Sequence, residues 1–135
     1  GPFDLVLFVA VFEHFADLKR VLEKTRALLR PGGKVLIVNV PNARFWKTRL
    51  INFALSSLLK PFVVNCSPMH SPFHLYEFTP KSLKHLLAKT GFKTDRIWIE
   101  TGHNYRLTRF YRFASFWVKS LGCGEIIRAL ATKPE

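Results

Sequence analysis

Residues 3–42 read FDLVLFVAVFEHFADLKRVLEKTRALLRPGGKVLIVNVPN, and this stretch decides the fold. Residues 5–12 form a nearly unbroken apolar run, which is typical of a strand covered on both faces and is too short to span a membrane. From residue 18 onward, apolar residues recur at helical spacing with charged residues between them. Pro31-Gly32-Gly33 then ends this helix and reverses the chain into a second buried strand at residues 34–40. Two strands joined through a helix run parallel, so the sequence predicts an α/β fold.

Polar residues follow each of the two predicted strands. Glu13 and His14 come directly after the first strand, and Pro41-Asn42 comes after the second. Because ligands in an open parallel sheet bind outside the carboxyl ends of the strands, we expect these residues to border one site. Each also has a structural alternative. His14 caps the following helix or bonds to a backbone carbonyl, and Asn42 makes an Asx turn.

Two further segments combine basic and aromatic residues. Residues 44–60 and 106–121 are predicted helices in which arginine and lysine stand beside phenylalanine, tryptophan and leucine. Such faces suit peripheral contact with an anionic membrane, or the mouth of a pocket for a hydrophobic or acidic molecule. They are equally consistent with helices that pack on the sheet and turn their cationic sides to water. Between them, the sequence predicts a helix from Thr79-Pro80 to Gly91 and a strand at residues 92–100.

Charge and cysteine content restrict the class of protein. Lysine and arginine number 21 against 9 aspartates and glutamates, and the net charge of +12 raises nucleic acid or an anionic surface as partners. No recognition motif supports nucleic acid, so it is not an expected partner. Cys66 and Cys123 are isolated thiols without metal-ligand spacing. The sequence therefore predicts no metal site and a reduced, cytoplasmic protein.

Several segments together carry a resemblance to a known family. They are FDLV at residues 3–6, FEH at 12–14, LLRPGGKV at 28–35 and VPN at 40–42. This combination resembles the C-terminal half of a class I S-adenosylmethionine-dependent methyltransferase, and most closely the group that includes ubiquinone-pathway O-methyltransferases. HLYEFTPKSL at residues 74–83, followed by Gly91-Phe92, is similar to the segment in which these enzymes return from a substrate-covering insertion. The resemblance covers residues 3–99, with a final strand at residues 126–132.

The resemblance implies a Rossmann-like sheet of seven strands, mostly parallel with the last strand antiparallel, of which this chain would supply strands four to seven. It implies one partial domain with a strand-helix-strand core at residues 1–42, a helical lid at 43–78 and a C-terminal helix and strands at 79–135. The family's glycine-rich loop and ribose-binding acidic residue have no counterpart here. We therefore expect a fragment whose strand at residues 5–12 has an unpaired edge, across which two copies pair or exchange strands.

The resemblance also implies methyl transfer from S-adenosylmethionine to a small-molecule acceptor, with O-methylation of a hydrophobic or anionic compound as the expected reaction. Imidazole is a natural base near neutral pH, so His14 and His74 are the catalytic candidates. The expected cofactor contacts are Val11, Phe12, Glu13 and His14. The expected acceptor contacts are Asn42, Trp46 and Tyr76. His74 and Tyr76 have the structural alternatives of a half-buried histidine and a loop anchor.

Two other functions remain open from the sequence. One is a non-catalytic half-domain that associates through its open sheet edge. The other is a basic binder of membrane or nucleic-acid surfaces, which the charge and the aromatic residues favour. On the methyltransferase interpretation, this chain by itself is expected to bind the cofactor weakly, because the glycine-rich half of the family's cofactor site is not in its sequence.

Overall fold

The computed structural model describes the chain apart from residues 1, 58–62, 68, 70, 102–117 and 119. Its elements follow one another in the order β1 (Phe3–Val9), a 3-10 turn η1 (Phe12–His14), α1 (Leu18–Leu28), β2 (Leu29–Pro41), α2 (Trp46–Ser56), α3 (Pro80–Lys89), β3 (Lys93–Glu100) and β4 (Ile126–Thr132). None of the described helices is long and apolar enough to cross a membrane.

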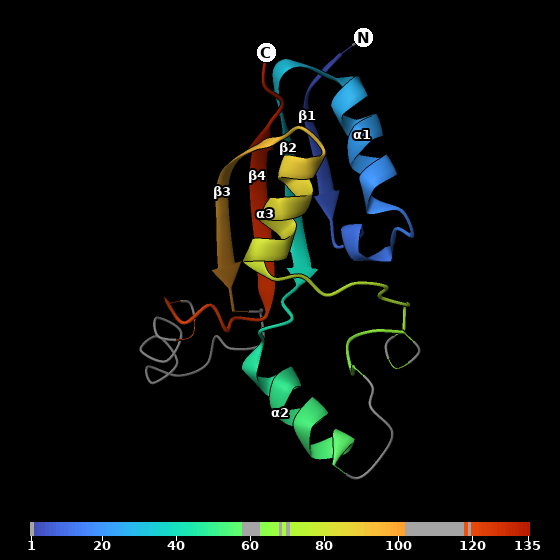
Figure 1. Ribbon diagram of the computed structural model, residues 1–135, viewed down its shortest axis with the longest axis vertical. Coiled ribbons are helices and arrows are strands. Elements are labelled where there is room, and N and C mark those ends of the chain that lie inside the picture. The colour runs from blue at the N-terminus through green and yellow to red at the C-terminus, as the bar shows by residue number, and fades with distance from the viewer. Residues whose placement is uncertain (1, 58–62, 68, 70, 102–117, 119) are drawn as a thin grey trace.

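The four strands form one mixed sheet in the order β1-β2-β4-β3 (Figure 1). β1 and β2 run parallel, with Val6 opposite Val35 and Phe8 opposite Ile37. β4 lies between β2 and β3 and is antiparallel to both of them. The predicted α/β class, the parallel pair and the antiparallel final strand are therefore confirmed.

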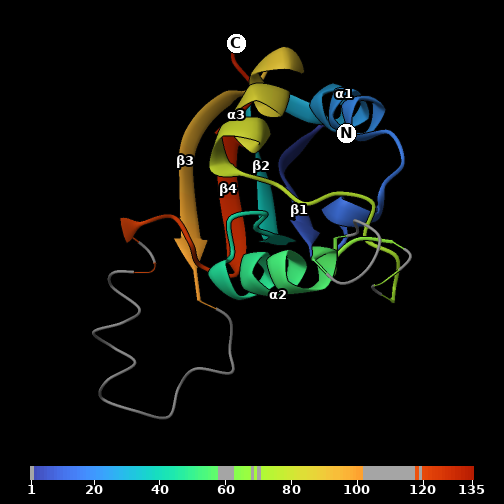
Figure 2. The same cartoon turned by 60° about the horizontal axis from the view of Figure 1, so that its bottom comes forward.

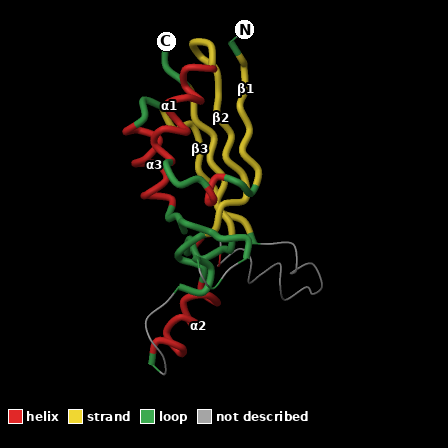
Figure 3. The backbone as a smooth tube through the Cα atoms, turned by 90° about the vertical axis from the view of Figure 1, so that its right-hand side faces the viewer, coloured by secondary structure: helices red, strands yellow, loops and turns green. Residues whose placement is uncertain are grey.

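Helices α1 and α3 lie on the same face of the sheet (Figure 3), and the core fills the space between. Alternate residues of β2 and β4 point into this core because side chains alternate across a strand. The buried apolar residues include Val35, Ile37, Ala129 and Ala131 of the sheet and Leu22, Leu83 and Leu87 of the helices. Among the described residues no helix covers the opposite face, where Leu5, Leu7 and Val9 are about half exposed.

The first strand differs from its predicted bounds of residues 5–12. β1 ends at Val9, because Ala10 takes a positive φ of 49° and turns the chain out of the sheet. Residues 12–14 then form the 3-10 turn η1. Phe12 lies outside the strand. It is fully buried between Phe8 and Phe78, whose ring centroids are 5.6 and 5.7 Å from its own, and this core position accounts for an apolar residue there.

The second strand begins earlier than the predicted residue 34. Phe3 pairs with Leu29 and Leu5 pairs with Lys34, so residues 30–33 of β2 bulge opposite a single residue of β1. Gly32 has a φ of 73°, and a Cβ on Gly33 would lie 2.9 Å from the Arg30 carbonyl oxygen. The predicted Pro31-Gly32-Gly33 turn is thus a bulge inside the strand, and glycine is required in it.

The later elements agree more closely with the sequence. α3 begins at Pro80 with Thr79 as its N-cap, and β4 has the predicted bounds. α2 is shorter than the predicted residues 44–60, since it begins at Trp46 and ends at Ser56. Most of the helix predicted at residues 106–121 lies outside the described residues.

Candidate functional site

The candidate site lies where the carboxyl ends of the parallel strands meet. η1 follows β1, Pro41 ends β2, and α2 lies beyond these strand ends (Figure 2). A cavity of about 170 Å³ opens there, and its described lining residues are Glu13, Asn39, Pro41, Phe45, Asn65, His74, Glu125 and Ile126. The two strand ends thus meet at one hollow, and residues of the segment between β2 and α3 also line it.

A larger hollow of about 630 Å³ lies elsewhere on the surface. Its described lining residues all belong to α3 and its N-cap, and they include Lys81, Lys84 and His85. It contains no strand end and no carboxylate among these residues. We therefore place the site at the smaller cavity, where polar groups from three separate segments converge.

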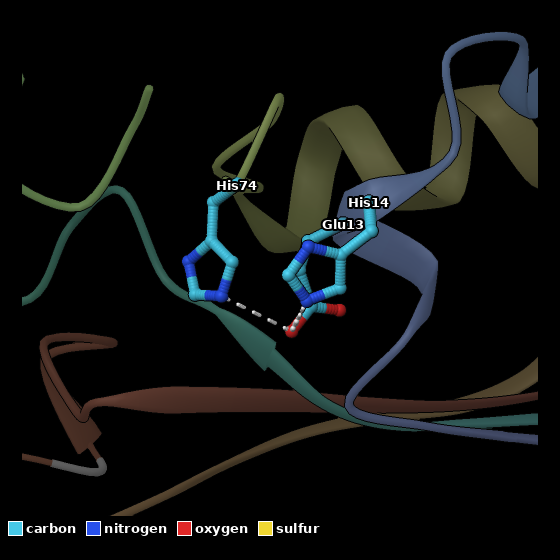
Figure 4. A group of neighbouring side chains, drawn as sticks. All are labelled: Glu13, His14 and His74. Carbon is cyan, nitrogen blue, oxygen red and sulfur yellow. Dashed lines mark ion pairs between the residues drawn. The ribbon is translucent and has the colours of Figure 1, made fainter. Parts of the chain in front are cut away.

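Glu13, His14 and His74 form the centre of this site (Figure 4). Oε1 of Glu13 lies 4.0 Å from Nε2 of His14 and 3.8 Å from Nε2 of His74. The two imidazole rings are 4.7 Å apart between centroids and tilted by 59°. The Glu13 side chain is 3% exposed, against 28% for His14 and 14% for His74. A buried carboxylate thus stands between two partly accessible imidazoles.

Backbone groups hold the two histidines together although they are far apart in sequence. Nδ1 of His14 lies 3.0 Å from the Phe73 carbonyl oxygen, and the Leu75 amide donates to the Glu13 carbonyl at 2.9 Å. Because a carbonyl can only accept, Nδ1 of His14 carries the proton. Nε2 of the neutral ring is then the acceptor nitrogen, and this is the atom that faces Glu13.

The segment that leads into α3 is fastened to the strand ends at several points. The Phe78 amide donates to the Pro41 carbonyl at 2.9 Å, and the Ala43 amide donates to the Phe78 carbonyl at 2.8 Å. The Tyr76 hydroxyl donates to the Ala16 carbonyl at 2.9 Å, which is the anchoring role that was its structural alternative. These bonds determine where His74 stands.

Asn42 is fully buried and its amide bonds to the backbone. Its Nδ2 donates to the carbonyls of Gly122 and Gly124 at 3.0 and 2.6 Å, and its Oδ1 accepts from the Arg44 amide at 3.0 Å. The last bond is that of an Asx turn. The structure thus gives Asn42 the turn-forming role that the sequence left open beside ligand contact.

The other predicted site residues are less tightly gathered. Phe12 packs in the core, whereas Val11 before it is 41% exposed. Trp46 opens α2 and is 47% exposed, with the Lys47 ammonium 5.7 Å from its ring centroid. Neither Trp46 nor Tyr76 is among the described residues that line the cavity.

Sequence reasoning missed several residues of the cavity wall. Asn39 has a φ of 64°, a conformation that asparagine tolerates better than most residues, so an asparagine near a strand end was the available signal. Asn65 donates to the Glu77 carboxylate at 2.8 Å and to the Thr48 hydroxyl at 3.2 Å, and no pattern in the sequence indicates this. Glu125 precedes β4 and likewise stands in no motif.

The nearby cysteine is not an activated nucleophile. Burial raises the pKa of the Cys66 thiol, and the Glu77 carboxylate raises it further. A thiol is nucleophilic as the thiolate, and both causes disfavour that form. The chemistry available at this site is therefore that of imidazole and carboxylate: proton transfer, stabilisation of a positive charge, or coordination of a cation.

Comparison with known proteins supplies the family context. Residues 1–97 match the family model described as a methyltransferase domain. The comparison with curated proteins gave no match.

Solved structures with the same fold share little sequence with this chain. An S-adenosylmethionine-dependent methyltransferase from Thermotoga maritima is 16% identical with a TM-score of 0.60, and the alignment covers 98% of this chain and 56% of that one. One from Methanosarcina mazei is 19% identical with a TM-score of 0.59, and the alignment covers 98% and 59%. Magnesium protoporphyrin IX methyltransferase from Synechocystis, solved with bound S-adenosylhomocysteine, is 12% identical with a TM-score of 0.53, and the alignment covers 98% and 45%. The chain thus spans little more than half the length of the first two structures.

Proposed function

Since the chain belongs to the methyltransferase domain family, we propose that it provides the acceptor side of an S-adenosylmethionine-dependent O-methyltransferase. The observation that supports this role is the pair of imidazoles set around the buried Glu13 carboxylate at the strand ends. The acceptor that we propose is a hydrophobic or anionic small molecule with a phenolic or catecholic hydroxyl, as in the ubiquinone-pathway group that the sequence resembles.

The cavity sets a limit on how much of the cofactor these residues hold. Sites that bury a ligand of drug size generally exceed about 300 Å³, and the cavity at the strand ends measures about 170 Å³. We therefore propose that the described residues hold only one end of the cofactor. Val11, Glu13 and His14 are the residues that we propose on the cofactor's side, while Phe12 supports them from the core.

When bound, S-adenosylmethionine supplies a sulfonium methyl group that is already a good electrophile. The residues of this chain then need to align the acceptor oxygen, exclude water and take up its proton. We assign the proton to Nε2 of His74, because His74 lines the cavity. Glu13, 3.8 Å away, would stabilise the imidazolium that forms. His14 is the second candidate base.

The test is methyl transfer from labelled S-adenosylmethionine to hydroxylated aromatic acceptors, measured on the protein that carries this chain. His74→Gln is expected to lower kcat by about 10²-fold or more, since general bases contribute on that order. The matched control is His85→Gln, which changes an exposed histidine on α3. Equal rates for the two variants would overturn the base assignment, and methylation of amines but not of hydroxyls would overturn O-methylation.

The exposed surface of α2 supports a hydrophobic acceptor or peripheral contact with a membrane. Trp46, Leu50 and Phe53 are 47, 60 and 74% exposed, and Lys47 and Arg49 lie on the same helix. Apolar and cationic residues mixed in this way suit an interface with anionic lipid. Sedimentation with anionic and neutral vesicles tests this, and equal recovery in the supernatant with both would exclude membrane contact.

A second candidate function is association through β1. This strand pairs with β2 on one side and is the edge of the described sheet. Its residues Phe3, Leu5, Leu7 and Val9 are 53, 49, 51 and 49% exposed. An apolar edge of this length is a template for pairing with another strand. The proposed partner is a second copy of the chain.

A further inference from the structure

We propose that Glu13, His14 and His74 form a binding site for one divalent transition-metal ion, with open coordination positions toward the strand-end cavity. The three side chains each offer one ligand atom, and these atoms all lie within 4.8 Å of one another. The inference goes beyond the proposed function, because ion binding by these residues does not depend on methyl transfer. It also departs from the sequence prediction of no metal site.

The separations are close to those that a bound ion requires. Zinc-type ions are held at about 2.0–2.2 Å by imidazole nitrogen and carboxylate oxygen. An ion between Glu13 and either histidine would therefore bring Oε1 and Nε2 somewhat nearer than the observed 3.8 and 4.0 Å. Rotation of the two imidazoles about their side-chain bonds supplies a movement of this size. All three side chains point toward one common space (Figure 4).

The hydrogen bond of His14 prepares its ring to act as a ligand. A metal-binding histidine usually donates its other ring N–H to a carbonyl or carboxylate, which fixes the tautomer and the orientation of the ring. Nδ1 of His14 has this partner in the Phe73 carbonyl at 3.0 Å. In the neutral ring, the Nε2 lone pair then faces the Glu13 oxygen at 4.0 Å. Two electron-rich atoms directed at one space are both stabilised when a cation lies between them.

Burial gives the cation a second reason to bind. The Glu13 side chain is 3% exposed, and an ionised carboxylate in such surroundings is costly unless positive charge lies beside it. Imidazole binds a metal in its neutral form. Two neutral imidazoles and one carboxylate carry a single negative charge, which a divalent cation compensates.

The ligand types select the class of ion. Two imidazoles and one carboxylate are the set found in catalytic zinc sites and in non-haem iron sites that keep open positions. Magnesium and calcium prefer oxygen ligands, so this set disfavours them. Glu13 and His74 line the cavity at the strand ends. An ion on that wall would direct its open positions into the cavity, where a water molecule or an acceptor oxygen can bind.

A bound ion would change the role of His74. Coordination occupies its Nε2, so that nitrogen could no longer accept a proton. An acceptor hydroxyl bound at an open position would instead be acidified by the ion and lose its proton to water. Methyl transfer measured with and without a chelator separates the two cases. A chelator abolishes transfer if the ion activates the acceptor and leaves it intact if His74 is the base.

The direct test is titration of the metal-free 135-residue chain with Zn²⁺ by calorimetry and with Co²⁺ by visible absorption. We expect one ion per chain, Co²⁺ bands of a site with nitrogen ligands, and a rise in Tm on addition of Zn²⁺. His14→Gln and His74→Gln are each expected to weaken binding by about 100-fold or more, since loss of an outer-shell partner alone costs about 10- to 100-fold. His85→Gln should bind as the unchanged chain does.

Several results would overturn the proposal. They are the absence of saturable binding, or an affinity in either His14→Gln or His74→Gln equal to that of His85→Gln. Circular dichroism of each variant checks that it is folded. If the spectrum of Glu13→Gln matches that of the unchanged chain, its metal affinity is compared with that of His85→Gln in the same way. Binding is measured without cofactor or acceptor, so failure of the methyltransferase proposal leaves this test unaffected.

Discussion

The buried side-chain amide of Asn42 forms hydrogen bonds to two segments that are far apart in the sequence. Its Nδ2 donates to the carbonyls of Gly122 and Gly124, and its Oδ1 accepts from the Arg44 amide. The side chain therefore joins the start of the insertion to the segment that enters β4. Glu125 in that segment lines the cavity, so the shape of the cavity depends on these bonds.

Asn42→Ala is expected to lower the free energy of unfolding by about 2–3 kcal/mol, because buried carbonyls lose their donors and each unsatisfied group costs about 1–3 kcal/mol. Urea denaturation measures this. Asn52→Ala is the matched control, since Asn52 is half-buried and its side-chain Oδ1 accepts from the Val64 amide at 3.0 Å. That change should cost about 1 kcal/mol. Equal losses in the two variants would contradict the role given to Asn42.

Asp95 makes stability depend on pH in a predictable direction. Hydrogen bonds from Lys34 and then from Thr132 hold the pKa of Asp95 below its ordinary value. A carboxyl whose pKa is lower in the folded chain stabilises the fold above its unfolded pKa of about 3.9, and this contribution is lost as the pH falls through the folded pKa. The unchanged chain should therefore lose stability more steeply below about pH 4 than Asp95→Asn does.

The measurement for Asp95 is the urea midpoint as a function of pH. Lys34→Met removes the largest cause of the shift, the bond from Nζ of Lys34 to Oδ2 of Asp95 at 2.7 Å. It should flatten the acid side of the profile in the same way. Parallel profiles for the unchanged chain and both variants would show that this pair does not govern the acid transition.

At the scale of elements, α3 has a start signal that is local and complete. Thr79 accepts from the Ser82 amide at 3.0 Å, Ser82 accepts from the Thr79 amide at 2.9 Å, and Pro80 occupies the first turn. These bonds satisfy amides that a helix leaves without partners at its first turn. The return of the insertion ends at this cap, so the cap also limits where His74 can stand.

Thr79→Ala is expected to lower the free energy of unfolding by about 1 kcal/mol, the usual cost of losing an N-cap. Chemical denaturation measures the change. Ser56→Ala is the control, because Ser56 is exposed near the end of α2 and its hydroxyl bonds back to the Asn52 carbonyl. Its loss should be within about 0.5 kcal/mol of zero, as for most surface changes. A larger effect at Ser56 than at Thr79 would contradict this account.

The sequence predicts best those elements whose bounds are marked by residues of the element itself or directly beside it. Thr79-Pro80 marked the start of α3. The range Ile126–Thr132 of β4 came from the family resemblance and is also correct. The end of β1 could not be predicted, because Phe12 is apolar for the sake of the core and reads like a strand residue. The bulge at residues 30–33 was also hidden, since a glycine pair predicts a turn but not its pairing with Lys133.

The candidate site could be predicted in part for the same reason. The rule that parallel strand ends meet placed Glu13-His14 and Pro41-Asn42 at one edge, and the structure has them there. The rule gives no distances between side chains. The approach of His74 to Glu13 depends on the backbone bond from Leu75 to the Glu13 carbonyl, which joins segments far apart in sequence. No local pattern contains that information.

At the scale of the whole molecule, the sheet has helices on one face and an apolar edge strand. α1 and α3 share a face, and the described chain leaves Leu5, Leu7 and Val9 half exposed on the other (Figure 3). Contiguous apolar surface of this kind marks a site of association. By resemblance, other strands of the family's sheet would pair with the free edge of β1 in the described sheet. We expect that what pairs there decides whether the chain binds the cofactor or associates with a second copy.

Leu7→Lys is expected to abolish self-association of the chain, because a lysine on the edge strand opposes pairing with a second strand. Light scattering after size-exclusion chromatography should show a dimer for the unchanged chain and a monomer for the variant. Leu50→Lys is the control, since Leu50 is 60% exposed on α2. A monomeric unchanged chain, or equal dissociation by both variants, would remove the proposed pairing.

The backbone hydrogen bonds of Phe78 with Pro41 and Ala43 hold together the two ends of residues 44–72. We expect that this segment can be replaced without loss of the fold. The start and the end of this segment lie side by side, and the entropic cost of closing a loop rises only slowly with its length. Chimaeras that replace residues 44–72 with a foreign segment are expected to stay folded, with a loss in the free energy of unfolding limited to the bonds that this segment makes, such as the one from the Val64 amide to Asn52. We expect a replaced segment to alter the wall of the strand-end cavity, which Phe45 and Asn65 line, while the sheet stays unchanged.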